Sequence, residues 1–302
     1  MQAFTKKQHP LGFWQASPMP TAEELENFYA GYFQQNFEYP DEYTQEELEY
    51  RRNKSRVVNE VLTRLGKGGG GQSGESGKNK KKRLVDIGCG EGFIMEHFFN
   101  LNWQVLGIDF GSRGIAQHHP PLLPYLMAGE PNTIIEHLKR NGEVFEVVSL
   151  LNVMEHTTDP EMLLELVRGI MNEQSTLIIS VPNDFSAFQL HMLEYGRIGN
   201  EFWFSPPEHL QYYNLANLSA LLESRRFRVV FSYADFPVEL YLANEHSCYI
   251  SDQSKGKAAH NSRLFVDNFL VSRGLKKYVD YASAMADIGL GRNIVVFAEL
   301  EV

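Results

Sequence analysis

The segment from Leu84 to Phe93 constrains the fold of this chain more than any other, and its sequence is Leu-Val-Asp-Ile-Gly-Cys-Gly-Glu-Gly-Phe. A short apolar run meets three alternate glycines and then an amphipathic stretch, which predicts a strand, a tight turn and a helix. Glycines allow a sharp turn and let a ligand approach the N–H groups at a helix N-terminus. The segment therefore predicts an α/β fold that binds a ligand beside this turn.

The residues after this turn alternate β-rich runs with amphipathic stretches. We predict strands at residues 84–87, 104–108, 124–127, 144–151, 176–181, 228–231 and 293–300. Helices are predicted at residues 93–101, 133–139 and 160–171 and directly after Asn214, with Asp159 and Asn214 as N-caps. This alternation predicts an α/β, Rossmann-like, doubly wound sheet of seven mostly parallel strands with helices on both faces.

The chain has 302 residues, more than such a sheet needs, and we predict three parts. Residues 1–65 are expected to form a helical cover, because Thr21 with Glu24 and Thr44 with Glu47 match the capping box. Its aromatic residues are expected to pack on the main domain. They are Phe28, Tyr29, Tyr32, Phe33, Phe37, Tyr39 and Tyr43.

Residues 66–83 are rich in glycine and lysine, a composition that predicts a flexible loop. The main domain, which we expect to bind the cofactor, then covers residues 84–302 and carries two insertions, at 183–213 after the fifth strand and at 234–291 after the sixth. Long insertions in a compact domain are usually functional, so we expect both to roof a substrate site.

Composition limits the partners and the compartment. Lys and Arg number 28 against 38 Asp and Glu, and the net charge of -10 disfavours nucleic acid and anionic membranes as partners. Two cysteines cannot form a disulfide framework or a four-cysteine zinc site. No apolar run approaches the roughly 20 residues of a membrane span, and no secretory signal begins the chain. We expect a cytoplasmic protein, and its oligomeric state is left open.

The glycine spacing separates two classes of cofactor. A dinucleotide site needs Gly-x-Gly-x-x-Gly, whose third glycine would fall at position 93, where this chain has Phe93. The observed Gly-x-Gly-x-Gly resembles the first motif of class I S-adenosylmethionine-dependent methyltransferases. Asp86, Gly88, Gly90 and Gly92 match that motif. The resemblance implies that these residues and the intervening Cys89 bind S-adenosylmethionine.

Further cofactor residues follow the next strands. Asp109 ends a predicted strand 17 residues after Gly92, where a carboxylate can accept both hydrogen bonds of a ribose diol. In the methyltransferases this position holds the ribose, and Phe110 would pack against the adenine. By the same resemblance Glu130 would lie near the adenine amino group and Asn152 near the methionine moiety. An exposed turn is the alternative for Asp109, and a surface position the alternative for Glu130.

The segment from Asn152 through Glu155 and His156 to Pro160 resembles the fourth-strand region of small-molecule methyltransferases. Amino-directed enzymes carry Asn/Asp-Pro-Pro-Tyr here, and Val153 after Asn152 disfavours that subclass. His156 is a candidate catalytic residue, although it can also serve only as a hydrogen-bond partner across the loop.

After the fifth strand, Glu208-His209 followed by Tyr212 and Tyr213 resembles a segment of sugar C-methyltransferases and natural-product O-methyltransferases. Methyl transfer from a sulfonium requires an aligned acceptor that loses its proton. We therefore predict His209 as general base, with Glu208 orienting it or sharing the proton. The two tyrosines are predicted to shape the substrate pocket. The four-cysteine zinc module of many sugar enzymes is missing, and no metal is expected.

These patterns favour a methyltransferase that transfers a methyl group from S-adenosylmethionine to a small-molecule acceptor and releases S-adenosylhomocysteine. The acceptor is expected to be a hydroxyl or an activated carbon, in a sugar or a related metabolite. Two alternatives stay open: a non-catalytic relative that binds the cofactor, and a nicotinamide-dependent oxidoreductase, which Phe93 disfavours.

Overall fold

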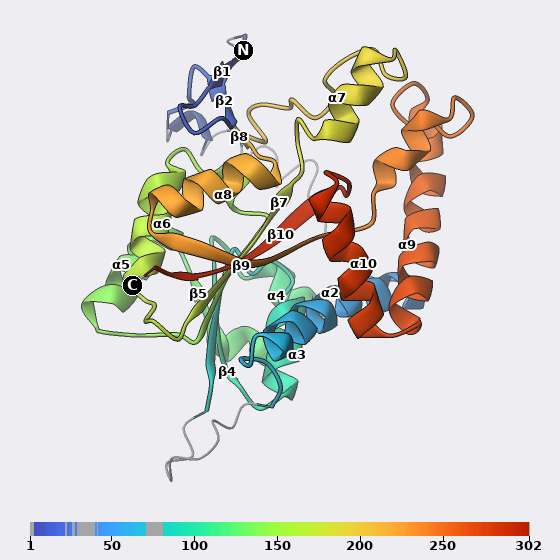
Figure 1. Ribbon diagram of the computed structural model, residues 1–302. Coiled ribbons are helices and arrows are strands. Elements are labelled where there is room, and N and C mark those ends of the chain that lie inside the picture. The colour runs from blue at the N-terminus through green and yellow to red at the C-terminus, as the bar shows by residue number, and fades with distance from the viewer. Residues whose placement is uncertain are drawn as a thin grey trace.

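The computed structural model describes residues 3–21, 23–25, 28, 40, 42–70 and 81–301. Its main element is a seven-stranded sheet in the order β5-β4-β3-β6-β7-β10-β9 (Figure 1). The strands are β3 (Arg83–Ile87), β4 (Gln104–Asp109), β5 (Leu126–Ala128), β6 (Val147–Leu151), β7 (Thr176–Pro182), β9 (Phe227–Ala234) and β10 (Asn293–Leu300). The five strands from β5 to β7 pair in parallel, and β10 is antiparallel to both neighbours. The predicted seven-stranded, mostly parallel sheet is confirmed.

Helices cover both faces of the sheet (Figure 1). The helices are α2 (Gln45–Arg64), α3 (Phe93–Asn100), α4 (Arg113–His118), α5 (Pro131–Arg140), α6 (Pro160–Arg168), α7 (Ala187–Glu194), α8 (Leu215–Ser224), α9 (Gly256–Ser272) and α10 (Leu275–Asp287). Because α5, α6 and α8 cover one face and α2, α3 and α10 the other, every residue of the interior strand β7 is buried.

Local capping signals begin several helices where the sequence predicts. Thr44 and Glu47 form a reciprocal capping box at the start of α2. Asp159 accepts a hydrogen bond from the Met162 N–H and caps α6, and Asn214 caps α8. These contacts satisfy N–H groups that lack partners within the helix.

The first 17 residues differ from the predicted helical cover. Strands β1 (Thr5–Gln8) and β2 (Trp14–Ser17) form an antiparallel hairpin, and β2 also pairs with β8 (Gln211–Tyr212). Since all residues of β1 are exposed, no apolar alternation marks it, and the third strand lies some 200 positions along the chain. The predicted packing of Tyr29, Tyr32, Phe33, Phe37 and Tyr39 lies outside the described residues, as does most of the predicted loop at 66–83.

The two insertions contain structure of their own. The first holds α7 and β8, and the second holds a 3-10 helix (Val238–Ala243), a short 3-10 turn (Gln253–Lys255), α9 and α10. Both α9 and α10 contact α2, and α10 also packs on β9 (Figure 1). The second insertion therefore joins α2 in covering the β9 half of the sheet.

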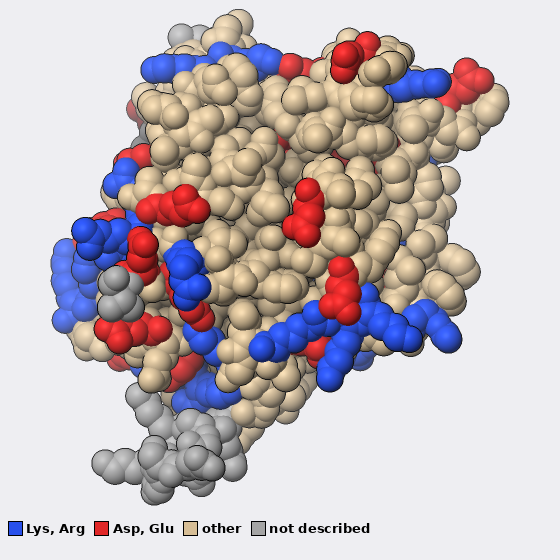
Figure 2. All heavy atoms as spheres, viewed as in Figure 1, with Lys and Arg blue, Asp and Glu red and all other residues tan. Residues whose placement is uncertain are grey.

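The face of the molecule in Figure 2 carries Lys and Arg side chains interspersed with Asp and Glu, mostly along its margins. Its centre is largely uncharged. Over the described residues that this view shows, acidic side chains lie among the basic ones, instead of the uninterrupted basic surface typical of proteins that bind nucleic-acid phosphates. Among the described residues, no helix has both the length and the apolar character needed to cross a membrane.

Candidate active site

The turn between β3 and α3 has the tight geometry that its glycines predict. Gly88, Gly90 and Gly92 have φ angles of 71°, 52° and 84°, in the left-handed region that glycine adopts without strain. A Cβ at Gly88 would lie 2.5 Å from the Val153 Cγ2 atom. A side chain at this position would therefore be disfavoured twice, by backbone conformation and by space.

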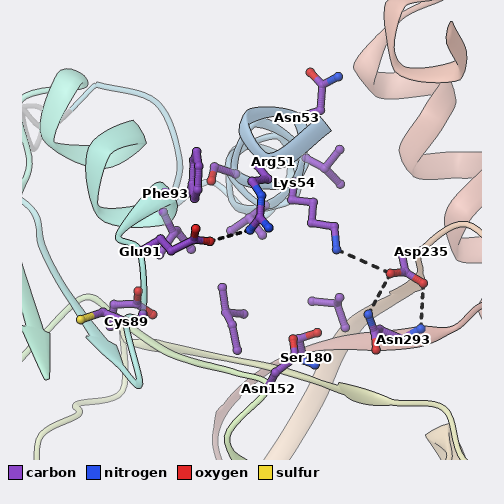
Figure 3. A pocket seen from close by; sticks show the side chains of 18 of the residues that line it. Arg51, Asn53, Lys54, Cys89, Glu91, Phe93, Asn152, Ser180, Asp235 and Asn293 are labelled. Carbon is purple, nitrogen blue, oxygen red and sulfur yellow. Dashed lines mark hydrogen bonds and ion pairs between the residues drawn. The ribbon is translucent and has the colours of Figure 1, made fainter. Parts of the chain in front are cut away.

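A cavity of about 370 Å³ opens beside this turn (Figure 3). It lies at the carboxyl ends of β3, β6 and β7, the edge at which open α/β sheets bind ligands. Six predicted cofactor residues line it: Asp86, Gly88, Cys89, Gly90, Gly92 and Asn152. Residues of α2, α9, α10, β9 and β10 complete its walls. The second insertion thus contributes residues to the cavity, whereas none of the residues that line it belongs to the first insertion, and the predicted substrate role of both stays a prediction.

Asp86 and Cys89 are buried at the base of the loop. The Ser149 hydroxyl donates a hydrogen bond of 2.7 Å to Asp86 Oδ1, while burial raises the pKa of Asp86 to about 7. Burial also raises the pKa of the Cys89 thiol, which therefore stays protonated. Cys89 contributes its backbone and a small buried side chain to the loop, not a nucleophile.

Asp109 links the end of β4 to the glycine loop. Its Oδ2 accepts a hydrogen bond from the Gly90 N–H at 2.9 Å, and its Oδ1 accepts one from the Gly111 N–H at 3.3 Å. Phe110 next to it is 67% exposed, so its ring is available for contact with a planar ligand. The predicted ribose and adenine contacts stay predictions, and the loop contact of Asp109 is a role that the sequence did not indicate.

Glu130 has a structural role. Its carboxylate accepts hydrogen bonds from the N–H groups of Asn132 and Thr133 and so caps α5. Both oxygens are engaged by this cap, so the predicted adenine contact would compete with it.

Asn152 connects the cavity to a buried acid. Its φ angle is 58°, and its side chain donates a hydrogen bond of 3.1 Å to Glu155 Oε1. Glu155 is 1% exposed, and its second oxygen has no hydrogen-bond partner among the described residues. Burial raises the pKa of Glu155 to about 8.

The structure brings His156 and His209 together, as two of the three predicted catalytic residues. Their ring centres are 5.0 Å apart in an edge-to-face arrangement. His156 Nδ1 lies 2.7 Å from the Glu208 carbonyl oxygen, and the Leu210 N–H donates to the Glu155 carbonyl oxygen. Burial lowers the pKa of each histidine to about 4. Both imidazoles are therefore neutral near pH 7 and able to accept a proton.

Glu208 contributes its backbone carbonyl to this arrangement, since that oxygen is the contact of His156 Nδ1. The Glu208, His156 and His209 side chains lie outside the set of residues that line the 370 Å³ cavity. Between the two histidines and the cavity lies Glu155, whose carboxylate accepts the hydrogen bond from Asn152 and has a donor atom within 4.8 Å of each histidine.

The predicted pocket-shaping role of Tyr212 and Tyr213 requires correction, because the two side chains are 0% and 1% exposed and line neither described cavity. The Tyr212 hydroxyl donates to the His209 carbonyl oxygen at 2.6 Å and so holds the backbone of that segment. Tyr213 packs against Phe13 in the main core, with ring centres 5.1 Å apart. The burial follows from the N-terminal strands, which cover this segment.

Glu155, His156 and His209 also form a potential metal site. One donor atom of each lies within 4.8 Å of the others. Imidazole nitrogens with a carboxylate are a donor set that divalent transition metals accept. The sequence predicts no metal, since the four-cysteine module is missing; a metal ion bound at this cluster would contradict that prediction.

Two basic residues of α2 that the sequence analysis did not identify also line the cavity (Figure 3). Arg51 Nη1 lies 2.6 Å from Glu91 Oε2, within the glycine loop, and Tyr43 donates to the other Glu91 oxygen. Lys54 Nζ lies 3.8 Å from Asp235 Oδ2. In the sequence these residues resemble an ordinary charged helix surface, so only the tertiary structure identifies them.

Comparisons with known proteins agree with this geometry. The sequence model of a family described as "Methyltransferase domain" matches residues 48–231. The ubiquinone biosynthesis O-methyltransferase of Aeromonas salmonicida is 29% identical over 104 residues, which are 34% of this chain and 44% of that protein. Its namesake from Cereibacter sphaeroides is 36% identical over 103 residues, 33% of this chain and 41% of that protein. The chain thus spans less than half the length of these relatives.

Solved structures share the fold. The 1,6-didemethyltoxoflavin-N1-methyltransferase of Burkholderia thailandensis, determined with 1,6-didemethyltoxoflavin and S-adenosylhomocysteine, superposes with a TM-score of 0.50 at 13% identity. That match covers 98% of this chain and 99% of the other. Since the family match covers more than half of the chain, this protein belongs to the methyltransferase-domain family and has the fold of a class I S-adenosylmethionine-dependent methyltransferase.

Proposed function

We propose that this protein transfers the methyl group of S-adenosylmethionine to a small-molecule acceptor. The observation that carries this proposal is the glycine turn, whose three left-handed glycines lie beside the cavity and are tied to Asp109 at the next strand end. This geometry leaves backbone N–H groups at the start of α3 open to a ligand. Family membership adds independent support.

The cavity suits the methionine half of the cofactor. Arg51 supplies positive charge for its carboxylate, and Asn152 lies at the end of β6 for its amino group. Asp109 does not line the cavity, so the ribose it would hold lies outside, with the adenine beside the exposed Phe110. In this arrangement the adenosine covers the end of β4 and the sulfonium points inward.

We assign the acceptor proton to His209. Methyl transfer neutralises the sulfonium, and the acceptor oxygen must lose a proton as its bond to the methyl carbon forms. His209 is neutral near pH 7, and its Nδ1 is buried without a hydrogen-bond partner among the described residues. Glu155 accepts a hydrogen bond from Asn152 in the cavity wall, and one of its oxygens lies within 4.8 Å of a ring nitrogen of His209. Glu155 therefore connects the proposed base to the cavity in which we place the cofactor.

An oxygen nucleophile is the acceptor that the comparisons favour. The relatives from Aeromonas salmonicida and Cereibacter sphaeroides are both named ubiquinone biosynthesis O-methyltransferase. We therefore favour a hydroxyl acceptor over an activated carbon. A non-catalytic protein that binds the cofactor is the alternative.

Turnover with S-adenosylmethionine labelled in its methyl group tests this function. The purified protein is incubated with a small-molecule metabolite extract, and labelled products are separated by chromatography. We expect a labelled product, a loss of at least ~100-fold with His209→Ala, and no change with His246→Ala, whose side chain is 88% exposed. Cofactor binding without any labelled product would identify a binding protein, and full activity of His209→Ala would place the base elsewhere.

A further inference from the structure

A second recess, of about 160 Å³, lies between α2 and α9. Its lining residues are Glu47, Tyr50, Arg51, Lys54, His260, Arg263 and Leu264. Arg51 and Lys54 also line the larger cavity, so the two spaces adjoin. A ligand in the larger cavity that extends past these two side chains would enter the recess.

The recess has an excess of positive charge. Arg263 donates a hydrogen bond to His260 Nδ1 at 2.8 Å, but within the described part of the chain no carboxylate forms an ion pair with it. Burial and Arg263 lower the pKa of His260, which is then neutral near pH 7. Glu47 already accepts hydrogen bonds from Thr44 as part of the α2 cap. Its other oxygen, Oε1, lies 3.5 Å from His260 Nε2, so Glu47 places one negative charge in the recess against the three cations Arg51, Lys54 and Arg263.

Lys54 adds to this charge. Burial lowers its pKa, but Tyr50 and Asp235 raise it by more, so Lys54 stays protonated. Its distance of 3.8 Å to Asp235 is too long for a direct hydrogen bond. Asp235 is itself held by two hydrogen bonds from Asn293, from the backbone N–H and from the side chain. The Lys54 ammonium thus has capacity for a further partner.

Two donors in the recess are buried without a partner. Tyr50 is 5% exposed, and its hydroxyl has no hydrogen-bond partner among the described residues. The same is true of Arg263 Nε. The Lys54 ammonium and the Arg263 guanidinium lie 4.9 and 5.3 Å from the centre of the Tyr50 ring. The two cations therefore flank one ring, and among the residues that line this recess Glu47 alone carries a carboxylate.

We infer that this recess is an anion-binding subsite, and that the methyl acceptor carries a carboxylate that Arg263, Lys54 and Tyr50 bind. The inference rests on the proposed methyltransferase function. A planar guanidinium, an ammonium and a hydroxyl match the oxygens of a carboxylate. Arg263 and Tyr50 line the recess but not the cavity beside the glycine turn, so this anion belongs to a ligand other than the cofactor.

The inference gives the second insertion a function. Arg263 lies on α9, within the segment 234–291 in which the sequence shows no motif. An acceptor held there by its carboxylate would extend past Lys54 into the cavity, with its hydroxyl toward the cofactor. The distance from the recess to the glycine turn would then select acceptors by length as well as by charge.

Calorimetric titration with a matched pair of probes tests this subsite. Benzoate and its neutral analogue benzamide are titrated into protein saturated with S-adenosylhomocysteine. We expect benzoate to bind at least ~10-fold tighter than benzamide, because a charge-assisted hydrogen bond is lost in the amide. Arg263→Met should abolish the preference. Arg273→Met, at the exposed C-cap of α9, should retain it.

Tyr50→Phe provides a second variant that keeps the ring and removes only the unpaired hydroxyl. It should weaken benzoate binding ~3-fold or more and leave benzamide unchanged. Equal binding of the two probes to the wild type, or an unchanged preference in Arg263→Met, would overturn the inference. An equal loss of S-adenosylhomocysteine affinity in Arg263→Met would also overturn it, since the anion would then be the cofactor's own carboxylate.

The titration of S-adenosylhomocysteine itself comes first and separates the two proposals. If the wild type fails to bind it, the proposed function is refuted. The benzoate and benzamide titrations of the free protein then still decide whether the recess binds anions.

Discussion

Gly114 offers a sharp test of the cofactor loop, because it lies in α4 directly against the backbone of that loop. A Cβ at this position would lie 2.4 Å from the Gly90 oxygen, 2.7 Å from the Gly90 carbonyl carbon and 3.1 Å from the Glu91 nitrogen. Carbon contacts are favourable only near ~3.5 Å, so Gly114→Ala must move α4 and the loop apart by about 1 Å. Backbone atoms cannot give way as a flexible side chain would.

The size of the effect follows from this displacement. Overpacking of this kind costs ~1–3 kcal/mol, and each kcal/mol lowers the melting temperature by about 2–4 °C for a chain of this size class. A shift of about 1 Å in the loop should also weaken S-adenosylmethionine binding ~10-fold or more. Thermal unfolding and calorimetric titration of Gly114→Ala measure the two effects.

Gly111→Ala is the matched control. No heavy atom lies within 4 Å of the Cβ built at Gly111, its φ angle is not positive, and alanine keeps the N–H that contacts Asp109. We expect this variant to bind the cofactor within twofold of the wild type. If Gly114→Ala binds S-adenosylmethionine as tightly as Gly111→Ala, the loop geometry does not position the cofactor and the reasoning is refuted.

Three further predictions concern the residues around His209. Its pKa of about 4 means that the base is neutral above that pH. Since Glu155 and Asp86 change charge near pH 8 and 7, the range that tests His209 lies below pH 6, where kcat/KM should stay level down to about pH 5; a fall of ~10-fold per pH unit there would contradict this. If His209 acts as a base, treatment with EDTA should leave the methyltransferase activity unchanged. Loss of activity on treatment with EDTA, followed by its recovery when a divalent cation is added, would place a metal at Glu155, His156 and His209. Tyr213→Phe should keep full activity and raise the unfolding free energy by up to ~1 kcal/mol, because the buried Tyr213 hydroxyl has no hydrogen-bond partner among the described residues. A large loss of kcat in this variant would instead show that the hydroxyl acts on the substrate.

The cofactor side of the site was predictable because its signals are local. The three glycines, the strand before them and Asp109 lie within one strand-turn-helix-strand unit, so spacing alone brings them together. The strand predicted at residues 176–181 likewise corresponds to β7.

The acceptor side was less predictable because its contacts join distant segments. Tyr213 is buried by Phe13, two hundred residues earlier in the chain, and no local pattern reveals this pairing. Arg263 and Lys54 meet only because α9 folds back onto α2. Each of these basic residues has the appearance of a solvated helix surface in the sequence.

The His209 segment lies between these two cases. The Glu-His and Tyr-Tyr pattern marked the segment that holds His209, and the structure places this histidine beside His156. The Tyr212 hydroxyl supports the backbone of the same segment. The catalytic role of the two histidines stays a prediction. The burial of the Tyr212 and Tyr213 rings depends on the N-terminal hairpin. The sequence of this hairpin shows no alternation of apolar residues that would predict its strands.

Calorimetric titration of S-adenosylmethionine into the wild type and Asp109→Ala tests the central claim most directly. We predict a micromolar Kd for the wild type and at least ~10-fold weaker binding for Asp109→Ala, which loses the predicted ribose contact and the hydrogen bond from Gly90. No binding to the wild type at high micromolar concentrations, or equal affinity of the two proteins, would contradict the placement of the cofactor at this glycine turn.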